Sequence, residues 1–146
     1  MMEDNQFRHT LPVQIRFSDV DQFGHVNNSV YFSLYDLAKT TYVNDAMGHL
    51  DWNKMAIVVA NIKADFLVPV FFNEHLAIET RVTHLGHKSF TLEQRAVNPD
   101  DGVVKCVCTT VMVAYDVKNR EPIVIPDGYR DAVAEYEGVS REVLEM

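Results

Sequence analysis

A single long segment of this chain carries the apolar period of a helix, and it limits what the chain can fold into. The segment starts at Asn28 or Ser29, runs to Met47 and leaves only a narrow polar strip. Gly48 follows directly and suits a C-terminal cap. Because a helix this apolar has to be largely enclosed, the rest of the chain is expected to cover it. The apolar positions are Tyr31, Leu34, Tyr35, Ala38, Tyr42 and Ala46, widened by Val30, Leu37 and Val43.

Five extended segments accompany this helix. Residues 11–17 alternate apolar and polar side chains, which predicts a half-buried strand ahead of it. The strands expected after the helix are rich in β-branched and aromatic residues and cover residues 55–68, 75–85, 88–97 and 103–116. A turn signal, Asn-Pro-Asp-Asp-Gly, occupies residues 98–102, and a short helix is expected after Pro126, over residues 127–137.

The order of these elements predicts an α+β fold. One apolar helix without a second helical layer is best buried by a curved antiparallel sheet wrapped around it, which is the architecture of the hotdog fold. Residues 1–146 are expected to form a single domain of this type, because no linker, repeat or low-complexity tract divides the chain. Edge strands of such a sheet are available for pairing, so we expect a homodimer or a homotetramer.

Charge and cysteine content narrow the possible environment. A net charge of −8 disfavours nucleic-acid binding and requires a local basic patch for any anionic substrate. No apolar run approaches the ~20 residues that span a bilayer, and the N-terminus lacks the basic and apolar regions of a secretory leader. Cys106 and Cys108 lie two apart on an expected strand and are predicted to be buried free thiols. We therefore expect a cytoplasmic protein with no membrane partner.

The chemistry of the chain concentrates in residues 15–31. A strand-like run there ends in two carboxylates, Asp19 and Asp21, and Gly24 permits a sharp turn before the helix. This order places an anion beside a helix N-terminus, where free N–H groups and the positive end of the dipole stabilise a developing oxyanion. A carboxylate that attacks a carbonyl or activates water next to such donors is suited to acyl transfer.

Residues 19–31 resemble the motif of hotdog-fold thioesterases of the 4-hydroxybenzoyl-CoA thioesterase type. The family pattern is D-x-D-x-x-G-[HIV]-V-x-x-x-x-Y, and this chain reads DVDQFGHVNNSVY. The resemblance extends over nearly the full chain through Pro69, the segment GHKSF at 86–90, and the pair Ile125-Pro126. It implies an acyl-CoA thioesterase that uses coenzyme A only as part of its substrate and needs no metal or redox cofactor.

The same resemblance implies roles for individual residues. The second aspartate of the motif, which falls on Asp21, serves as nucleophile or general base against the thioester carbonyl. Backbone N–H groups near Asn28 form the oxyanion hole. The Gly-x-Lys-Ser turn helps to bind coenzyme A phosphates through Lys88 and Ser89, with His87 standing where other members can carry Arg.

Other interpretations of the motif stay open at the level of sequence. Asp21 also has the position of a turn aspartate that accepts from nearby N–H groups, and Asp19 is expected to be structural. His25 matches the histidine of a similar segment, D-x-N-x-H-V-N-N, in plant fatty acyl-carrier-protein thioesterases, although Phe23 replaces the asparagine. The imidazole equally suits a cap or a support for the turn. Asp36 is either a second carboxylate of the site or a solvated or interface residue.

Two further patterns and two alternative functions complete the predictions. His84 and His87 flank a glycine turn with no Asp, Glu or Cys at ligand spacing, so no metal site is expected. Lys63 is interpreted either as a phosphate contact or as a side chain that reaches the surface. The alternative functions are hydrolysis of acyl groups from acyl carrier protein and binding of acyl-CoA without catalysis.

Overall fold

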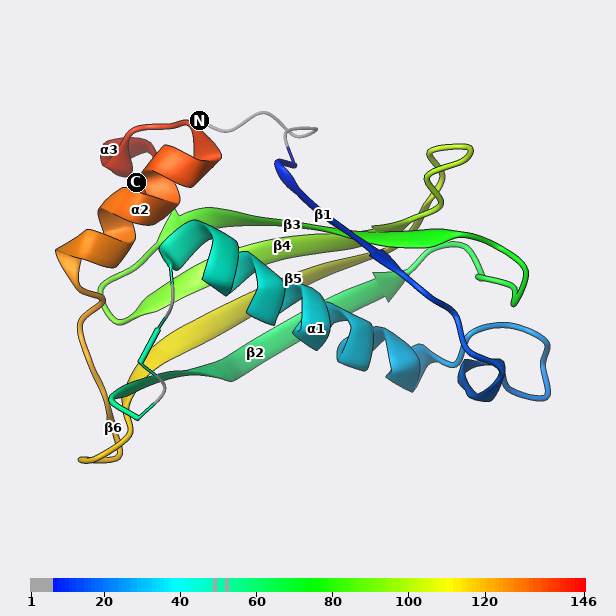
Figure 1. Ribbon diagram of the computed structural model, residues 1–146, viewed down its shortest axis with the longest axis horizontal. Coiled ribbons are helices and arrows are strands. Elements are labelled where there is room, and N and C mark those ends of the chain that lie inside the picture. Colours follow the sequence, from blue (N-terminus) through cyan, green and yellow to red (C-terminus); the bar gives the residue numbers. More distant parts are fainter. Residues whose placement is uncertain (1–6, 49, 52) are drawn as a thin grey trace.

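The structure, a computed structural model, describes residues 7–48, 50–51 and 53–146. Its helix α1 (Asn28–Met47) lies across one face of a curved antiparallel sheet (Figure 1). The strands in spatial order are β1 (His9–Val13), β3 (Leu76–Leu85), β4 (Ser89–Val97), β5 (Val104–Asp116) and β2 (Met55–Phe66), and β6 (Glu121–Pro122) pairs with β5. This arrangement confirms the predicted hotdog fold.

Helix α1 has the predicted bounds and the predicted cap. Its N-cap is Asn27, whose side chain accepts a hydrogen bond from the Ser29 N–H, and Gly48 ends it with φ of 74°. The inner face of α1 is fully buried against the sheet, whereas Phe32 and Leu37 on the outer face are exposed. The prediction that the helix is largely enclosed therefore holds for one face only.

A buried hydrogen-bond network holds α1 to the middle of the sheet. The Gln94 amide on β4 is fully buried and donates to the Tyr35 carbonyl and the Thr80 hydroxyl, both at 3.0 Å. Tyr35 and Ile78 belong to the same buried apolar cluster. Because an unsatisfied buried amide is costly, these bonds favour one register of helix against sheet.

The first strand is shorter than the alternation predicts. Residues 11–17 were expected to be extended, but β1 ends at Val13 and a 3₁₀ turn, η1 (Phe17–Asp19), follows. Ile15 is buried as the pattern requires, whereas the Phe17 side chain is 87% exposed. The pattern fails here because η1 changes the direction of the chain, so the period of 2 no longer applies.

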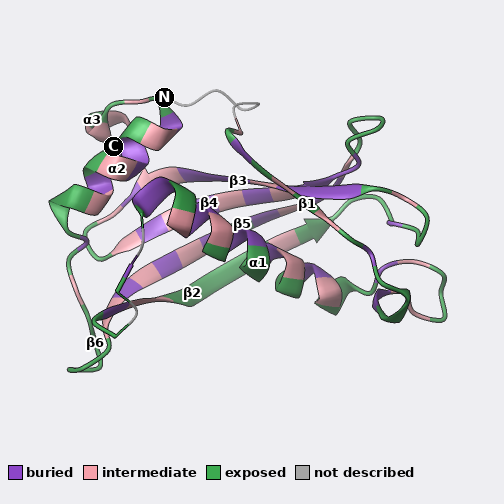
Figure 2. Ribbon diagram, viewed as in Figure 1, coloured by how far each residue is buried: buried purple, intermediate pink, exposed green. Residues whose placement is uncertain are grey.

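Strand β2 lies at the edge of the sheet. Strands β3, β4 and β5 pair as hairpins, but β2 pairs with β5, so residues 67–75 cross from one edge of the sheet toward the other. Hairpins therefore connect β3 to β4 and β4 to β5, and only the connection from β2 to β3 crosses the sheet. Most of β2 is exposed (Figure 2). Its large exposed apolar residues are Val58, Val59, Ile62 and Phe66.

The C-terminal part of the chain packs against α1 and β3. Helix α2 (Asp127–Glu137) was predicted with these bounds, whereas α3 (Arg141–Leu144) and β6 were not. Glu137 fixes α2 by accepting hydrogen bonds from the Tyr42 hydroxyl and, at 3.0 Å, from the Val82 N–H. Burial raises the pKa of the Glu137 carboxyl. None of the described helices is long and apolar enough to cross a membrane. The expectation about the N-terminal segment rests in part on residues 1–6, which lie outside the described residues.

Candidate functional site

The segment between β1 and α1 is held by a buried carboxylate. Asp19 accepts from the Arg16 N–H at 2.8 Å and from the Arg16 guanidinium at 2.9 Å. Burial by itself raises the pKa of Asp19, but the hydrogen bonds and charge of Arg16 outweigh it and hold that pKa below its usual value. The Asp19 carbonyl also accepts from the Asn27 N–H at 2.9 Å. Asp19 is therefore structural, as expected, and closes the loop of residues 19–27.

Replacing Asp19 with asparagine should lower the free energy of unfolding by about 1.5 kcal/mol at neutral pH, because charge-assisted hydrogen bonds are lost. The folded-state pKa of Asp19 is depressed, so its stabilisation is present above the unfolded value of about 3.9 and is lost as the pH falls through the folded value. Urea unfolding at about pH 7 and about pH 2 measures both effects. A difference between the two proteins that stays constant with pH would contradict this assignment.

Asp21 lies in the tight turn of the same loop. Its Oδ1 accepts from the Phe23 N–H at 2.9 Å, and its Oδ2 accepts from the Asn27 side-chain amide at 3.2 Å. The turn is closed by the Gly24 N–H, which donates to the Asp21 carbonyl at 3.0 Å while Gly24 has φ of 88°. Asp21 is partly exposed beside a hollow of about 280 Å³ whose other lining residues are Phe17, Val20 and Phe72. The carboxylate is thus accessible and oriented from two sides.

The start of α1 presents a backbone donor next to this turn. The Asn27 side chain accepts from the Ser29 N–H at 2.9 Å, and the Asn27 carbonyl accepts from the Val30 N–H at 3.0 Å. Among the described residues, no hydrogen bond uses the N–H of Asn28. Asn28 lines a cavity of about 300 Å³ together with His25, Val26, Tyr31 and residues 66–69. A free N–H at the positive end of a helix dipole is suited to an oxyanion.

His25 lines the second of these two hollows, the cavity that Asn28 also lines. Its ring is half-buried, its Nδ1 lies 3.4 Å from the Val26 carbonyl, and it stacks on Phe23 with ring centroids 6.4 Å apart. The His25 backbone pairs with Phe71, and the Val26 N–H donates to the Val70 carbonyl at 2.7 Å. The crossing after β2 therefore fixes the loop and closes the cavity.

The three predicted catalytic residues share one loop and one helix start. Asn27 links two of them, because its amide contacts Asp21 while its oxygen caps the helix that begins with Asn28. Asp21 lines one hollow, whereas His25 and Asn28 line the other. No sequence prediction singled out Asn27 for the site. Its signal was present, since asparagine before a helical segment is a favoured N-cap.

The predicted phosphate-binding residues lie elsewhere in the chain. His87 and Lys88 are exposed in the turn between β3 and β4, and Ser89 begins β4. Val13 at the end of β1 pairs with Leu76, at the opposite end of β3 from this turn. Ten strand residues cover roughly 30 Å, so one chain does not bring the turn and the loop of residues 19–27 together.

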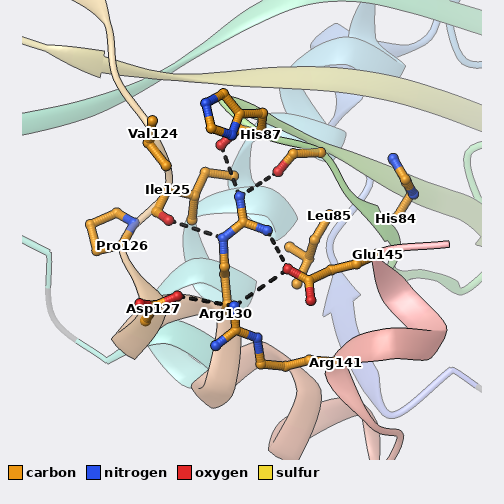
Figure 3. Close-up of a pocket in the computed structure, with 11 residues that line it drawn as sticks. His84, Leu85, His87, Val124, Ile125, Pro126, Asp127, Arg130, Arg141 and Glu145 are labelled. Atoms are coloured by element: carbon orange, nitrogen blue, oxygen red, sulfur yellow. Dashed lines mark hydrogen bonds and ion pairs between the residues drawn. The ribbon is translucent and has the colours of Figure 1, made fainter.

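His84 and His87 line a hollow of about 610 Å³ beside this turn (Figure 3). Within residues 7–48, 50–51 and 53–146, no group of three or more His, Cys, Asp or Glu is placed to hold a metal ion. Arg130 of α2 reaches the turn from this hollow, and the sequence predictions missed it. No local signal could have linked Arg130 to this turn, because the carbonyls that it contacts there lie 43 and 44 residues away.

The remaining candidates separate into core and surface. Cys106 and Cys108 are buried and unpaired, as predicted, and burial raises the pKa of both thiols. The Asp36 side chain is exposed, and its carboxylate lies 3.2 Å from the ammonium of Lys39, whose side chain is buried. Lys63 is exposed on β2, and both interpretations of it stay predictions.

The chain resembles known proteins over most of its length. It matches the family described as the thioesterase-like superfamily over residues 15–133. It is 24% identical to the acyl-CoA thioester hydrolase YbgC of Escherichia coli O6:H1 over 86% of this chain and 92% of that protein. A thioesterase from Thermus thermophilus, solved with coenzyme A and Zn, is 26% identical with a TM-score of 0.80 over 93% and 99% of the two chains. The PA5185 protein from Pseudomonas aeruginosa strain PAO1 is 30% identical with a TM-score of 0.78 over 90% and 92%.

Proposed function

This chain belongs to the thioesterase-like superfamily, and we propose that it hydrolyses an acyl-CoA to a carboxylic acid and free coenzyme A. The observation that carries the proposal is the free N–H of Asn28 at the start of α1, beside the turn that holds the Asp21 carboxylate. A donor and an anion at this place suit addition to a thioester carbonyl. The names of the relatives, acyl-CoA thioester hydrolase and thioesterase, support the choice of substrate.

In the proposed reaction, Asp21 acts in one of two ways. As a general base it takes a proton from water, the water oxygen bonds to the carbonyl carbon, and the Asn28 N–H donates to the oxyanion. The C–S bond then breaks and the coenzyme A thiolate takes the proton from Asp21. As a nucleophile Asp21 bonds to the carbonyl carbon, and the C–S bond breaks to release the coenzyme A thiolate and leave a mixed anhydride. Water then hydrolyses the anhydride, which returns the Asp21 carboxylate and the carboxylic acid, and the thiolate takes a proton from water. His25, which lines the same cavity as Asn28, is positioned to hydrogen-bond to the bound thioester. Neither route uses a metal or redox cofactor.

The proposal places the phosphates of coenzyme A at the turn between β3 and β4. Lys88 supplies a positive charge, and Ser89 and His87 supply hydrogen-bonding groups, in a chain with a net charge of −8. Among the described residues, the N–H groups of His87 and Lys88 donate no hydrogen bond, so both are available to an anion.

We further propose that the working form is a homodimer or a homotetramer paired through the β2 edge. This edge exposes a row of apolar side chains, and Phe66 on it contacts Phe32, an exposed residue of α1. Because the turn and the loop of residues 19–27 lie at opposite ends of one chain, a partner would supply the turn to each site. The predicted cytoplasmic location suits the two unpaired cysteines, because that compartment keeps thiols reduced. In this proposal residues 1–146 act as one domain.

A panel of thioesters tests the proposed function. Purified protein is given one acyl group as its coenzyme A thioester, its acyl-carrier-protein thioester and a short thioester without nucleotide, and thiol release is measured. We expect the highest kcat/KM for the coenzyme A thioester, because that substrate offers the diphosphate and the ribose phosphate of its nucleotide to the turn, whereas the carrier-protein arm carries a single phosphodiester and the short thioester none. Preference for the carrier-protein thioester would favour the first alternative function. Saturable binding of acyl-CoA without thiol release would favour the non-catalytic alternative.

A further inference from the structure

Arg130 of α2 donates two hydrogen bonds to the turn between β3 and β4, and its other bonds go to Ile125 and Glu145 (Figure 3). Its Nη2 donates to the Gly86 carbonyl at 2.5 Å and to the His87 carbonyl at 2.8 Å, and its Nε donates to the Ile125 carbonyl at 3.0 Å. The side chain is only 7% exposed. A planar guanidinium with fixed donor directions holds such a set of carbonyls in one geometry, which a flexible ammonium does not.

The turn itself is built so that its carbonyls point into the protein. The His87 carbonyl also accepts from the Ile125 N–H at 3.1 Å, and the Lys88 carbonyl accepts from the Ala114 N–H at 2.9 Å. The Gly86 N–H donates to the Ser89 carbonyl at 2.7 Å, and a Cβ at Gly86 would lie 2.9 Å from the Ser89 hydroxyl oxygen. With the carbonyls engaged on the inner side, the unused N–H groups of His87 and Lys88 are left for the outer side.

The Arg130 guanidinium is also bound by a residue near the C-terminus. Glu145 accepts from Arg130 Nη1 at 2.8 Å, and the same carboxylate oxygen lies 3.4 Å from Arg141 Nη2. Arg141 also pairs with Asp127 at 3.0 Å and Asp131 at 3.1 Å. None of the ion pairs of Arg141 reaches the turn, whereas Arg130 contacts both Glu145 and the turn carbonyls.

We propose that Arg130 is a positioning residue for coenzyme A: it holds the turn so that the two free N–H groups and Lys88 meet the phosphates of the substrate. This inference rests on the proposed function, because it needs the turn to be the phosphate site. Arg130 touches no substrate. Its removal would let the turn adopt other conformations, and ordering them again on binding weakens affinity without altering the chemical step.

The test compares two thioesters of the same acyl group, the coenzyme A thioester and the N-acetylcysteamine thioester, which lacks the nucleotide. For Arg130→Gln we expect KM for the coenzyme A thioester to rise about 10-fold with little change in kcat, and the short thioester to be unaffected. Arg130→Lys should recover part of the loss, because one donor and the charge return. Arg141→Gln is the matched control, since it removes ion pairs of the same hollow without touching Arg130 or the turn, and its rise in KM should be no larger than the small rise expected for Glu145→Gln.

Lys88→Ala separates failure of this inference from failure of the proposed phosphate site. A selective rise in KM for Lys88→Ala but not for Arg130→Gln would overturn the positioning role and keep the turn as the phosphate site. No rise for either variant would move the phosphate site elsewhere and remove the basis of both. Equal losses on the two thioesters in Arg130→Gln would indicate structural damage only and overturn the inference. In the double variant we expect less than the sum of the single effects, because both changes act on one binding event.

Glu145→Gln provides a second, milder variant if Arg130→Gln does not fold. It removes the charge that holds the guanidinium but keeps all the bonds from Arg130 to the turn. We expect a smaller rise in KM for the coenzyme A thioester and none for the short thioester. Thermal melting checks that the variant is folded. An unchanged KM in a folded Glu145→Gln protein whose Arg130→Gln counterpart is unfolded would overturn the proposal.

Discussion

Replacing Asp21 with asparagine is expected to lower kcat by about 10²–10⁴ with a modest change in KM. The substitution keeps the size of the side chain and an acceptor for the Phe23 N–H, but it removes the anion that takes a proton or attacks the carbonyl. The free N–H of Asn28 remains, so oxyanion stabilisation accounts for the residual rate. Steady-state hydrolysis of an acyl-CoA measures the effect.

Asp101→Asn is the matched control for this experiment. Asp101 Oδ1 accepts from the Val103 N–H at 2.9 Å, which is the same two-residue turn bond that Asp21 makes to Phe23 at 2.9 Å. Both substitutions therefore remove the charge of a turn aspartate, Asp21 at the candidate site and Asp101 away from it. We expect Asp101→Asn to keep the wild-type kcat. Near-wild-type turnover by a folded Asp21→Asn protein would falsify the assignment of Asp21.

Replacing Ile62 with aspartate is expected to produce a monomer whose kcat/KM for acyl-CoA is lower by about 10²-fold or more. Ile62 is 38% exposed on the edge strand β2, so a charge there disturbs the isolated chain little but opposes pairing of two such edges. The monomer would keep Asp21 and lose the partner's turn between β3 and β4. Light scattering at micromolar concentration, combined with the hydrolysis assay, follows both properties.

Thr10→Asp on β1 is the control, because it places the same charge on the other edge of the same sheet. This variant should keep the assembly and activity of the wild type. Full activity of a monomeric Ile62→Asp protein would remove the argument that each site needs two chains. Loss of assembly in Thr10→Asp but not in Ile62→Asp would assign the interface to β1 instead.

The elements of this fold were readable from local sequence where burial has a regular period. Helix α1 is marked by its apolar stripe, its asparagine N-cap and Gly48, all within the segment itself. The alternation along β3 to β5 and the turn at 98–102 are equally local. Such patterns record which face of an element is buried, so they predict type and bounds well. The alternation over 11–17 misled at Phe17, where the backbone turns.

The candidate site likewise has one part that the local sequence predicted and another that depends on tertiary contacts. Asp21, His25 and Asn28 lie within eight residues of one another, and the structure keeps them in one loop and helix start. The motif therefore predicted which of these residues lie together, and their roles in catalysis stay predictions. The contact of Asn27 with Asp21, and the cavity closed by residues 66–69, depend on how the loop packs against the crossing after β2.

What the sequence by itself determined was the kind of each element and the chemical groups placed at its ends. Only the tertiary structure decided that β2 lies at the edge, that the turn of His87 and Lys88 lies at the opposite end of β3 from Asp21, and that Arg130 supports this turn. The physical reason is that periodicity reports burial relative to an element's own axis. Strand order and a guanidinium bound to carbonyls 43 and 44 residues away arise from contacts between segments, for which a single sequence holds no local signal.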